Sequence, residues 1–245
     1  YAIWNWKASG GSGRANTQGG INSTVSVNDD AGFSIVTYTG NRTGAGVSTV
    51  GHGLSSAPKV VITKSRSNVT NWWMQHAGTT AASNLLQINT QDQPPAQVDK
   101  SSNGTLSRPT STVFGTNYTD GLGTNGHTMV AYCWAEVEGY SKFGSFTGNS
   151  SSNGPFIFTN FLPAWILIKK ATATGRYSVW DNKRNTFNPV NSILAWNSTY
   201  AEGTGSTWWI EQHSNGFKIR TSETEVNLNN ATMIYMAFAA SPFKT

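Results

Sequence analysis

The sequence predicts an all-β protein made of two tandem homologous antiparallel β-sandwich repeats, of the jelly-roll or lectin-like kind. Three observations lead to this prediction. The second half of the chain repeats the first, the apolar segments are short, and Gly- and Asn-rich turns separate them. Charged residues make up only 12% of the chain, against about 25% in an average soluble domain. Aromatic residues also reach 12%, which argues against disorder.

The internal repeat consists of matched segments in the same order. "FSIVTYTGN" at 33–41 matches "SKFGSFTGN" at 141–149, an offset of 149 − 41 = 108. "NGHTMVAYCWA" at 125–135 matches "NNATMIYMAFA" at 229–239, an offset of 104. Three further pairs lie between them, "APKVVITK" with "LPAWILIK", "NWWMQH" with "GRYSVW" and "LLQINT" with "ILAWNS". Small loop insertions explain the drift of the offset, so we infer a duplication.

The repeated phrase "MVAYCWA" alternates in side-chain size. Bulky Val130, Tyr132 and Trp134 alternate with small Ala131, Cys133 and Ala135. A period of two predicts a strand, with the large residues on one face and the small ones on the other. Its second copy, "MIYMAFAA", would also allow a helix, because Ala and Met favour helices. The run is short and a proline follows it, which favours a strand.

The other matched segments also predict strands. "VVIT" and "WILI" are continuous apolar runs, typical of strands that are covered on both faces. Pro58 and Pro163 precede them, at a position where no ladder donor is needed. Connectors such as "TGNRTGAG" and "TDGLGTNG" indicate turns. We therefore expect six to eight short strands in each repeat, as in a β-sandwich.

The repeat divides the chain into four ranges. Residues 28–138 and 139–245 are predicted to form the first and second β-sandwich repeats. "YAIWNWKA" at 1–8 echoes the end of each repeat, so we expect it to be the terminal strand of an upstream module. Residues 9–27 are rich in Gly, Ser and Asn, which predicts a flexible linker.

Composition argues against several partners. The formal net charge is +5, but the basic residues are scattered, so we predict no nucleic-acid binding. No apolar run approaches the ~20 residues of a membrane-spanning helix, so we predict no membrane insertion. The single cysteine, Cys133, excludes an intrachain disulfide and is expected to be a small buried side chain.

The search for catalytic chemistry predicts no enzyme, no metal and no cofactor. None of the four histidines forms a metal-binding spacing, and no nucleophile elbow or phosphate loop occurs. Glu136 and Glu138 lie two apart at a strand end, as do Glu223 and Glu225 in the second repeat. Such a pair shares one face of a strand and could form a glycosidase dyad. We expect solvated charges instead and keep a polysaccharide depolymerase as an alternative.

Aromatic residues remain as candidates for binding. Trp72–Trp73 and Trp208–Trp209 are adjacent pairs, and neighbours on a strand point to opposite faces. We expect one tryptophan of each pair in the core and the other on the surface. His76, which the repeat does not require, lies near the first pair. These five residues are the predicted ligand-binding set, with glycan binding and subunit packing as alternative roles.

Five segments carry a resemblance over about residues 32–244: "GFSIVTYTGN", "GLSSAPKVVITKSRS", "YCWAEVEGYSKFGSFTGN", "GPFIFTNFLPAWILIKK" and "IYMAFAASPFK". They resemble a repeated domain of tailed-phage structural proteins, especially of marine and aquatic phages, that are tail-fibre-like or receptor-binding components. "YAIWNWKASGG" resembles the end of the lectin-like module that often precedes this repeat.

The resemblance implies a non-enzymatic virion protein in a tail fibre or other external appendage. It implies attachment to a host-surface glycan or receptor, a homotrimer, and contacts with other virion proteins. It supplies no catalytic residues. The alternative function is purely architectural, as a head-fibre, decoration or spacer module of the virion.

Overall fold

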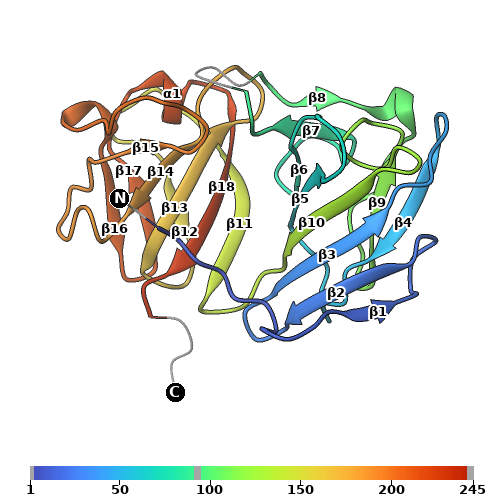
Figure 1. The fold of residues 1–245 in the computed structure, drawn as a ribbon. Coiled ribbons are helices and arrows are strands. Elements are labelled where there is room, and N and C mark those ends of the chain that lie inside the picture. The colour runs from blue at the N-terminus through green and yellow to red at the C-terminus, as the bar shows by residue number, and fades with distance from the viewer. Residues whose placement is uncertain (1–2, 91–94, 242–245) are drawn as a thin grey trace. The chain divides into compact units, whose positions relative to one another are not determined.

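Strands account for nearly all the regular structure of the chain (Figure 1). The computed structural model describes residues 3–90 and 95–241. In chain order the strands are β1 (Arg14–Asn16), β2 (Ser23–Asn28), β3 (Phe33–Thr39), β4 (Val47–Gly51), β5 (Val60–Ser65), β6 (Trp73–His76), β7 (Asn84–Gln87), β8 (Val98–Asp99), β9 (Val113–Asn117), β10 (Thr128–Trp134), β11 (Ser141–Thr147), β12 (Phe156–Phe158), β13 (Pro163–Lys170), β14 (Ser178–Asp181), β15 (Leu194–Ala195), β16 (Ile210–His213), β17 (Gly216–Ile219) and β18 (Thr232–Ala239). The helical segments of the described residues are α1 (Thr224–Asn227) and two 3-10 turns, Ser101–Asn103 and Ser206–Trp208. The prediction of an all-β fold with antiparallel sheets is confirmed.

The residues fall into two units by their internal contacts. The first unit comprises Tyr1–Leu85 and Val98–Val137, and the second comprises Leu86–Gln97 and Glu138–Thr245. We had expected the whole of residues 28–138 to form one repeat. Grouping Leu86–Gln97 with the second unit is a feature that no sequence pattern indicated.

Hydrogen bonds connect the segment Leu86–Gln97 to other residues of the second unit. The backbone N–H of Gln97 donates to the carbonyl oxygen of Ala171 at 2.7 Å. The hydroxyl of Tyr177 donates to the carbonyl oxygen of Gln87 at 3.0 Å. Tyr177 is fully buried, so this bond satisfies a hydroxyl that has lost its water.

The first unit has two sheets that share a core. The larger sheet has eight strands in the order β1-β2-β3-β10-β5-β6-β7-β8, and the smaller one pairs β4 with β9. Val50 of β4 and Phe114 of β9 join one hydrophobic cluster with Val36, Val61 and Met129 of the larger sheet. This burial of apolar area is the main force that holds the two sheets together.

Strand β10 confirms the predicted period of two. It pairs antiparallel with both β3 and β5, so that Cys133 lies opposite Ser34 and Val61. The small residues Ala131 and Cys133 face the core cluster. The bulky residues lie on the other face of the sheet.

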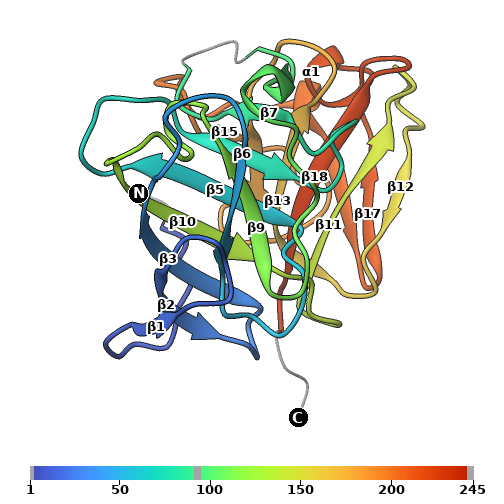
Figure 2. The ribbon, with the colours of Figure 1, turned by 90° about the vertical axis from the view of Figure 1, so that its right-hand side faces the viewer.

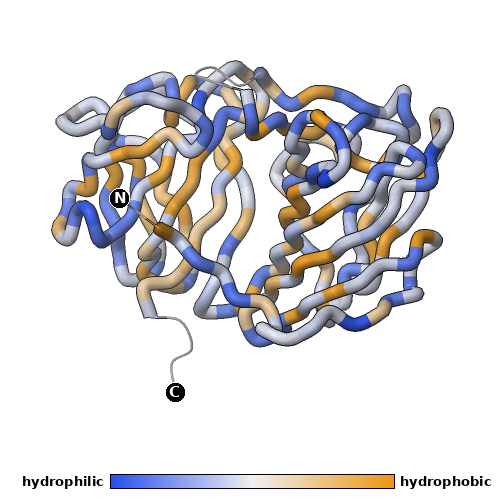
Figure 3. Tube along the Cα trace, viewed as in Figure 1, coloured by the Kyte–Doolittle hydropathy of each residue, from blue (hydrophilic) through white to orange (hydrophobic). Residues whose placement is uncertain are grey.

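The second unit also has two sheets, one of five strands and one of three. Their orders are β11-β18-β13-β14-β15 and β12-β17-β16. The shared core includes Ile166 and Trp180 from the larger sheet, and Ile157, Ile210 and Phe217 from the smaller. The trace is hydrophobic along much of β13 and β18 in Figure 3, whereas many of the connecting loops are hydrophilic. One face of the three-stranded sheet is thereby committed to the core.

Two further sequence predictions are confirmed. The segment "MIYMAFAA" lies in strand β18, not in a helix. The "VVIT" and "WILI" runs lie in β5 and β13 and are buried at every position, as expected for strands covered on both faces.

The N-terminal predictions need correction. Residues 9–27 are not only a linker, because they contain β1 and most of β2. Strand β1 pairs with β2, and β2 pairs with β3. Polar strands gain this structure from the neighbouring sheet edge, a tertiary effect that composition does not reveal. Residues 3–8 form no strand, and residues 1–2 lie outside the described residues. Trp6 instead packs edge-on against Trp134, with ring centroids 6.0 Å apart.

Candidate functional site

The two predicted tryptophans of the first unit have different environments. Trp73, in β6, is 3% exposed and its Nε1 donates to the carbonyl oxygen of Asp120 at 2.7 Å. Trp72 is half-buried and stacks on Tyr132, with ring planes at 12° and centroids 6.4 Å apart. Trp73 is therefore a core residue, and Trp72 presents only part of its ring to solvent.

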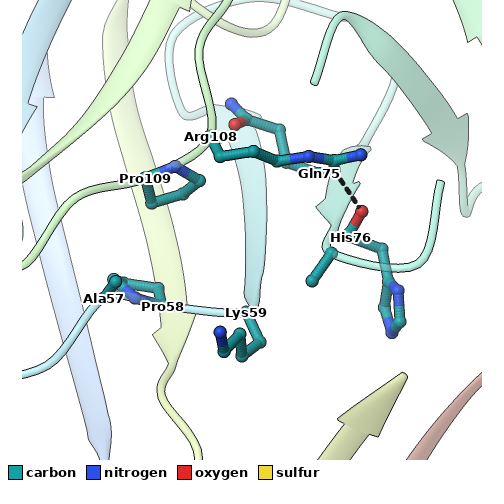
Figure 4. Close-up of a pocket in the computed structure, with 8 residues that line it drawn as sticks. Ala57, Pro58, Lys59, Gln75, His76, Arg108 and Pro109 are labelled. Atoms are coloured by element: carbon teal, nitrogen blue, oxygen red, sulfur yellow. Dashed lines mark hydrogen bonds between the residues drawn. The ribbon is translucent and has the colours of Figure 1, made fainter. Parts of the chain in front are cut away.

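His76 is buried rather than exposed. It is the last residue of β6 and is 1% exposed. Its carbonyl oxygen accepts a hydrogen bond from Nη1 of Arg108 at 2.6 Å, and its Nδ1 accepts one from the N–H of Gly78 at 3.0 Å. The imidazole points away from Arg108 (Figure 4). His76 thus contributes to a small pocket of the first unit through its main chain.

Trp208 and Trp209 do not lie on a strand. Trp208 ends a 3-10 turn and packs against the core of the second unit, where its carbonyl oxygen accepts from Nε1 of Trp180 at 3.0 Å. Trp209 follows the turn and is half-buried, and its carbonyl oxygen accepts from the N–H of Arg220 at 2.9 Å. The rule that neighbours point to opposite faces fails here because the turn replaces the expected strand. Neither tryptophan forms an open platform.

The most exposed aromatic pair on a strand is one that the sequence analysis missed. Phe156 and Phe158 lie on β12 and are 45% and 57% exposed, while Ile157 between them is buried in the core. Strand β12 is the edge of the three-stranded sheet and lies beside β17 (Figure 2). Residues two apart on a strand share a face about 7 Å apart, so the two rings form one apolar surface.

Strand register places polar side chains beside these rings. Phe156 lies opposite Lys218 of β17, which lies opposite Glu211 of β16. Phe158 lies opposite Gly216, which lies opposite His213. Paired residues point to the same side of a sheet, so all of them share the face turned away from the core. We call Phe156, Phe158, Glu211, His213, Gly216, Lys218 and Arg220 the aromatic face.

Glu211 is the centre of the polar half of the aromatic face. Its carboxylate lies 3.3 Å from Nε of Arg220 and 3.6 Å from Nε2 of His213. The ring of His213 also contacts Phe156, with centroids 5.7 Å apart. Lys218 has no ion-pair partner among the described residues. The face therefore offers a free ammonium and one shared carboxylate next to two apolar rings.

A glycine makes room for one of the rings. Gly216 is the first residue of β17, and a Cβ there would clash with the carbonyl oxygen of Ile157 and lie 2.9 Å from Cζ of Phe156. The backbone oxygen cannot move aside as a side chain could, so this position requires glycine, and the phenyl ring packs over the bare backbone. The local sequence thus sets the position of Phe156.

A cavity opens next to the aromatic face. It measures about 500 Å³, within the roughly 300–1,000 Å³ of small-ligand sites. Ser214 of the β16–β17 turn lines it, together with Asn160, Phe161 and Leu162 that follow β12. The carbonyl oxygen of Asn215 accepts from the N–H groups of Thr159 and Asn160, at 3.0 and 3.2 Å, and ties this loop to the turn.

The acidic pairs do not have the geometry expected of a dyad on a strand. Glu138 lines the same cavity, and Glu136 is partly buried. Glu223 and Glu225 lie at the start of α1, not on a strand, which corrects our prediction. Glu225 is 6% exposed and pairs with the ammonium of Lys170 at 3.4 Å, so it holds the fold together.

Other reactive groups are held in the core. Cys133 is fully buried, and desolvation raises the pKa of its thiol to about 12. No three His, Cys, Asp or Glu side chains gather at metal-binding distance within residues 3–90 and 95–241. In that same part of the chain, no helix has the length and apolar character needed to cross a membrane.

Comparison with known proteins gives a family without an assigned activity. The model of a family described as "Domain of unknown function (DUF7483)" matches residues 1–242. No curated protein and no solved structure matches the chain. The match covers nearly the whole sequence, and the chain therefore belongs to the DUF7483 family.

Proposed function

We propose that this chain is a non-enzymatic attachment module of a phage virion, part of a tail fibre or other external appendage, that binds glycans of the host surface. The aromatic face is the observation that carries the binding proposal. The sequence resemblance to tail-fibre-like proteins supports the place of the module in a virion.

The chemistry of the aromatic face suits a sugar. A saccharide ring has an apolar side of C–H groups and a rim of hydroxyls. The π-face of a phenyl ring is negatively polarised and attracts such C–H groups. Glu211 and His213 can accept hydroxyl hydrogen bonds, and Lys218 can donate them. The aromatic face combines both kinds of contact on one three-stranded sheet.

The expected strength is moderate. If a sugar covers roughly 50 Å² of one phenyl ring, burial contributes about 1.2 kcal/mol at ~25 cal/mol per Å². Two rings then account for a factor of roughly fifty in affinity. Several copies of a weak site on one particle would add avidity, which is why a multivalent appendage can use it. We propose a homotrimer that also contacts other virion proteins.

We also propose that the two units are tandem homologous β-sandwich repeats. Matched hydrogen bonds support this. Gly40 N–H donates to His127 O at 2.9 Å, and Gly148 N–H donates to Ala231 O at 3.0 Å. The differences are 148 − 40 = 108 and 231 − 127 = 104, the two offsets of the sequence repeat. The return bonds, Gly126 N–H to Gly40 O and Asn230 N–H to Gly148 O, match in the same way.

Strand register supports the same proposal. Phe33 lies opposite Trp134 in the first unit, and Ser141 lies opposite Phe238 in the second. The order β3-β10-β5-β6 corresponds to β11-β18-β13-β14. A shift of one residue would turn every side chain of a strand to the other face of the sheet. The matched registers therefore place corresponding residues of the two units on the core face.

A glycan array tests the binding proposal. The array is probed with the whole chain, with the double variant Phe156→Ala/Phe158→Ala, and with Phe187→Ala as a control. Phe187 is 84% exposed on a loop of the same unit, outside the aromatic face. We expect binding that the double variant loses and the control keeps, with unchanged melting temperatures, because all three side chains are exposed.

The architectural alternative predicts a different result. Strand β12 is an edge strand, and exposed edges with apolar side chains are also used for contacts between copies. If the double variant lowers the oligomeric state by light scattering and no glycan binds, the aromatic face is a subunit contact. Turnover of a polysaccharide that Glu136→Gln or Glu138→Gln abolishes would instead indicate a depolymerase.

A further inference from the structure

A second site lies in the first unit, far in sequence from the aromatic face. It is a pocket of about 160 Å³ next to the end of β6 (Figure 4). Its walls are Ala57, Pro58, Ala77 and Pro109, and its polar lining is Lys59, Gln75, His76 and Arg108. The volume is below the roughly 300 Å³ of a whole-ligand site, so the pocket suits one functional group of a larger ligand.

Arg108 is held in place by neutral groups alone. Its Nη1 donates to the carbonyl oxygen of His76 at 2.6 Å and to Oγ1 of Thr79 at 3.1 Å. Its Nη2 donates to the carbonyl oxygen of Thr79. No carboxylate among the described residues pairs with it. A partly buried positive charge therefore lacks a counter-ion.

The hydrogen bonds of Arg108 leave one edge of the guanidinium open. A guanidinium has five N–H donors in a planar arrangement. Two acceptors use both hydrogens of Nη1, and one acceptor uses a single hydrogen of Nη2. Thr79 accepts from both Nη1 and Nη2, so it occupies the edge between these two groups. The other edge, with Nε–H and the second Nη2–H, is left open. This edge is the fork that receives the two oxygens of a carboxylate.

Lys59 adds a second charge. It is half-buried in the pocket wall, and its ammonium has no hydrogen-bond or ion-pair partner among the described residues. In Figure 4 the side chains of Lys59 and Arg108 lie on opposite sides of the space that Pro58 and Pro109 border. Desolvation lowers the pKa of Arg108, which indicates that its charge is poorly solvated. A bound anion would offset the free-energy cost of keeping this charge partly out of water.

We propose that this pocket binds the carboxylate of an acidic sugar residue, with Arg108 holding the two oxygens and Lys59 supplying a second positive charge. The prolines and alanines provide an apolar wall for the carbon atoms next to the carboxylate. A structural role for Arg108 explains its three bonds to the 76–79 turn. It does not explain the open edge, the unpaired Lys59 or the cavity between them. The proposal stands apart from the aromatic face, so either site can fail alone.

The test is an NMR titration of the whole ¹⁵N-labelled chain with sodium glucuronate. Neutral glucose and sodium sulfate are the comparison ligands. We expect glucuronate to shift the amides of Lys59, Ala77 and Arg108, with millimolar affinity that weakens as salt is added. Glucose should not shift these amide signals. Sulfate should bind more weakly than glucuronate because it does not match the planar fork.

Three variants sharpen the test. Arg108→Lys keeps the charge but removes the fork, and should weaken glucuronate binding roughly tenfold or more. Lys59→Gln breaks no hydrogen bond of the fold and should weaken glucuronate binding about threefold, because it removes one positive charge that is only half-buried. Arg66→Gln removes an equal charge from an exposed site of the same unit and should change nothing.

Several results would overturn the proposal. Equal shifts with glucose would mean that the carboxylate is not recognised, and equal affinity for sulfate would remove the assignment to carboxylates. Binding that survives Lys59→Gln and Arg108→Lys unchanged, or an equal loss in Arg66→Gln, would place the interaction elsewhere. Absence of shifts at tens of millimolar glucuronate would exclude the site.

Discussion

Lys169 should make the stability of the second unit depend on pH in an unusual direction. This lysine, in β13, is fully buried, and its ammonium donates to the carbonyl oxygens of Lys170 and Ala173 at 2.6 and 3.1 Å. Desolvation lowers its pKa to about 7, against the opposing attraction of Glu225. The unfolded chain restores the ordinary value of 10.5.

The sign follows from proton binding. Between pH 7 and 10.5 the unfolded chain holds a proton on Lys169 that the folded chain has released. The free energy of unfolding therefore rises with pH in this window. Below about pH 7 the folded chain carries the full cost of burying the charged ammonium of Lys169. With these two pKa values the free energy of unfolding gains about 3 kcal/mol from pH 7 to pH 9.5. Above that, the buried Tyr38 and Tyr177, whose pKa values burial raises, begin to act in the opposite direction.

The assay is urea unfolding followed by tryptophan fluorescence at several pH values. Lys169→Met keeps the length of the side chain and removes its titration. The other titrating groups contribute equally to both proteins, so they cancel when the free energy of unfolding of the variant is subtracted from that of wild type. We expect this difference to increase by about 3 kcal/mol between pH 7 and 9.5. Lys183→Met, on an exposed loop, is the control and should follow the wild-type profile. A constant difference between wild type and Lys169→Met would refute the reasoning.

Three further predictions concern the core and the aromatic face. Asn227, fully buried, donates through Nδ2 to three oxygens at 2.8 to 3.0 Å, so Asn227→Ala should cost about 3 kcal/mol in urea unfolding and Asn227→Asp at least as much; a loss below 1 kcal/mol would contradict this. Cys133 should resist a thiol reagent in the native protein and react only on unfolding, since burial raises the pKa of its thiol to about 12; rapid native labelling would show that the core opens. Gly216→Ala should lower the melting temperature and reduce glycan binding, because a Cβ there would clash with the Ile157 carbonyl oxygen and meet Cζ of Phe156 at 2.9 Å, whereas Gly44→Ala, where a Cβ meets nothing within 4 Å, should change neither; unchanged glycan binding by Gly216→Ala would contradict this.

The all-β fold and its main strands could be predicted because their signal is local. The alternation in "MVAYCWA" and the apolar runs of β5 and β13 follow directly from which faces are covered. The strands β1 and β2 escaped prediction because their residues are mostly polar and small. Strand β2 forms on the edge of β3 and β1 on the edge of β2, and this depends on the fold as a whole.

The aromatic face could not be found by looking for tryptophans. In "FIF" all three residues are apolar, so the sequence does not tell which of them face solvent. Pairing with β17 decides this, because Ile157 lies opposite Phe217 in the core and its neighbours must point outward. The alternation of "IEQHSNGFKIR" around an Asn-Gly turn was the available signal, since it indicates a hairpin with one polar face.

The pocket at Arg108 was hidden for another reason. Its two cations are 49 residues apart in the chain, and only the return of the loop before β9 to the end of β6 brings them together. Isolated basic residues carry no pattern in a chain where such residues are scattered. His76, one of the predicted ligand-binding residues, lines this pocket, where its carbonyl oxygen accepts a hydrogen bond from Arg108.

Mapping a bound glycan on the protein tests the central claim most directly. The tightest ligand from the array is titrated into the ¹⁵N-labelled chain, and the shifted amides are assigned. We predict that they cluster on β12, β16 and β17, around Phe156, Phe158 and Lys218. Shifts confined to the surroundings of Trp72 or Trp209, with none on these three strands, would contradict the account.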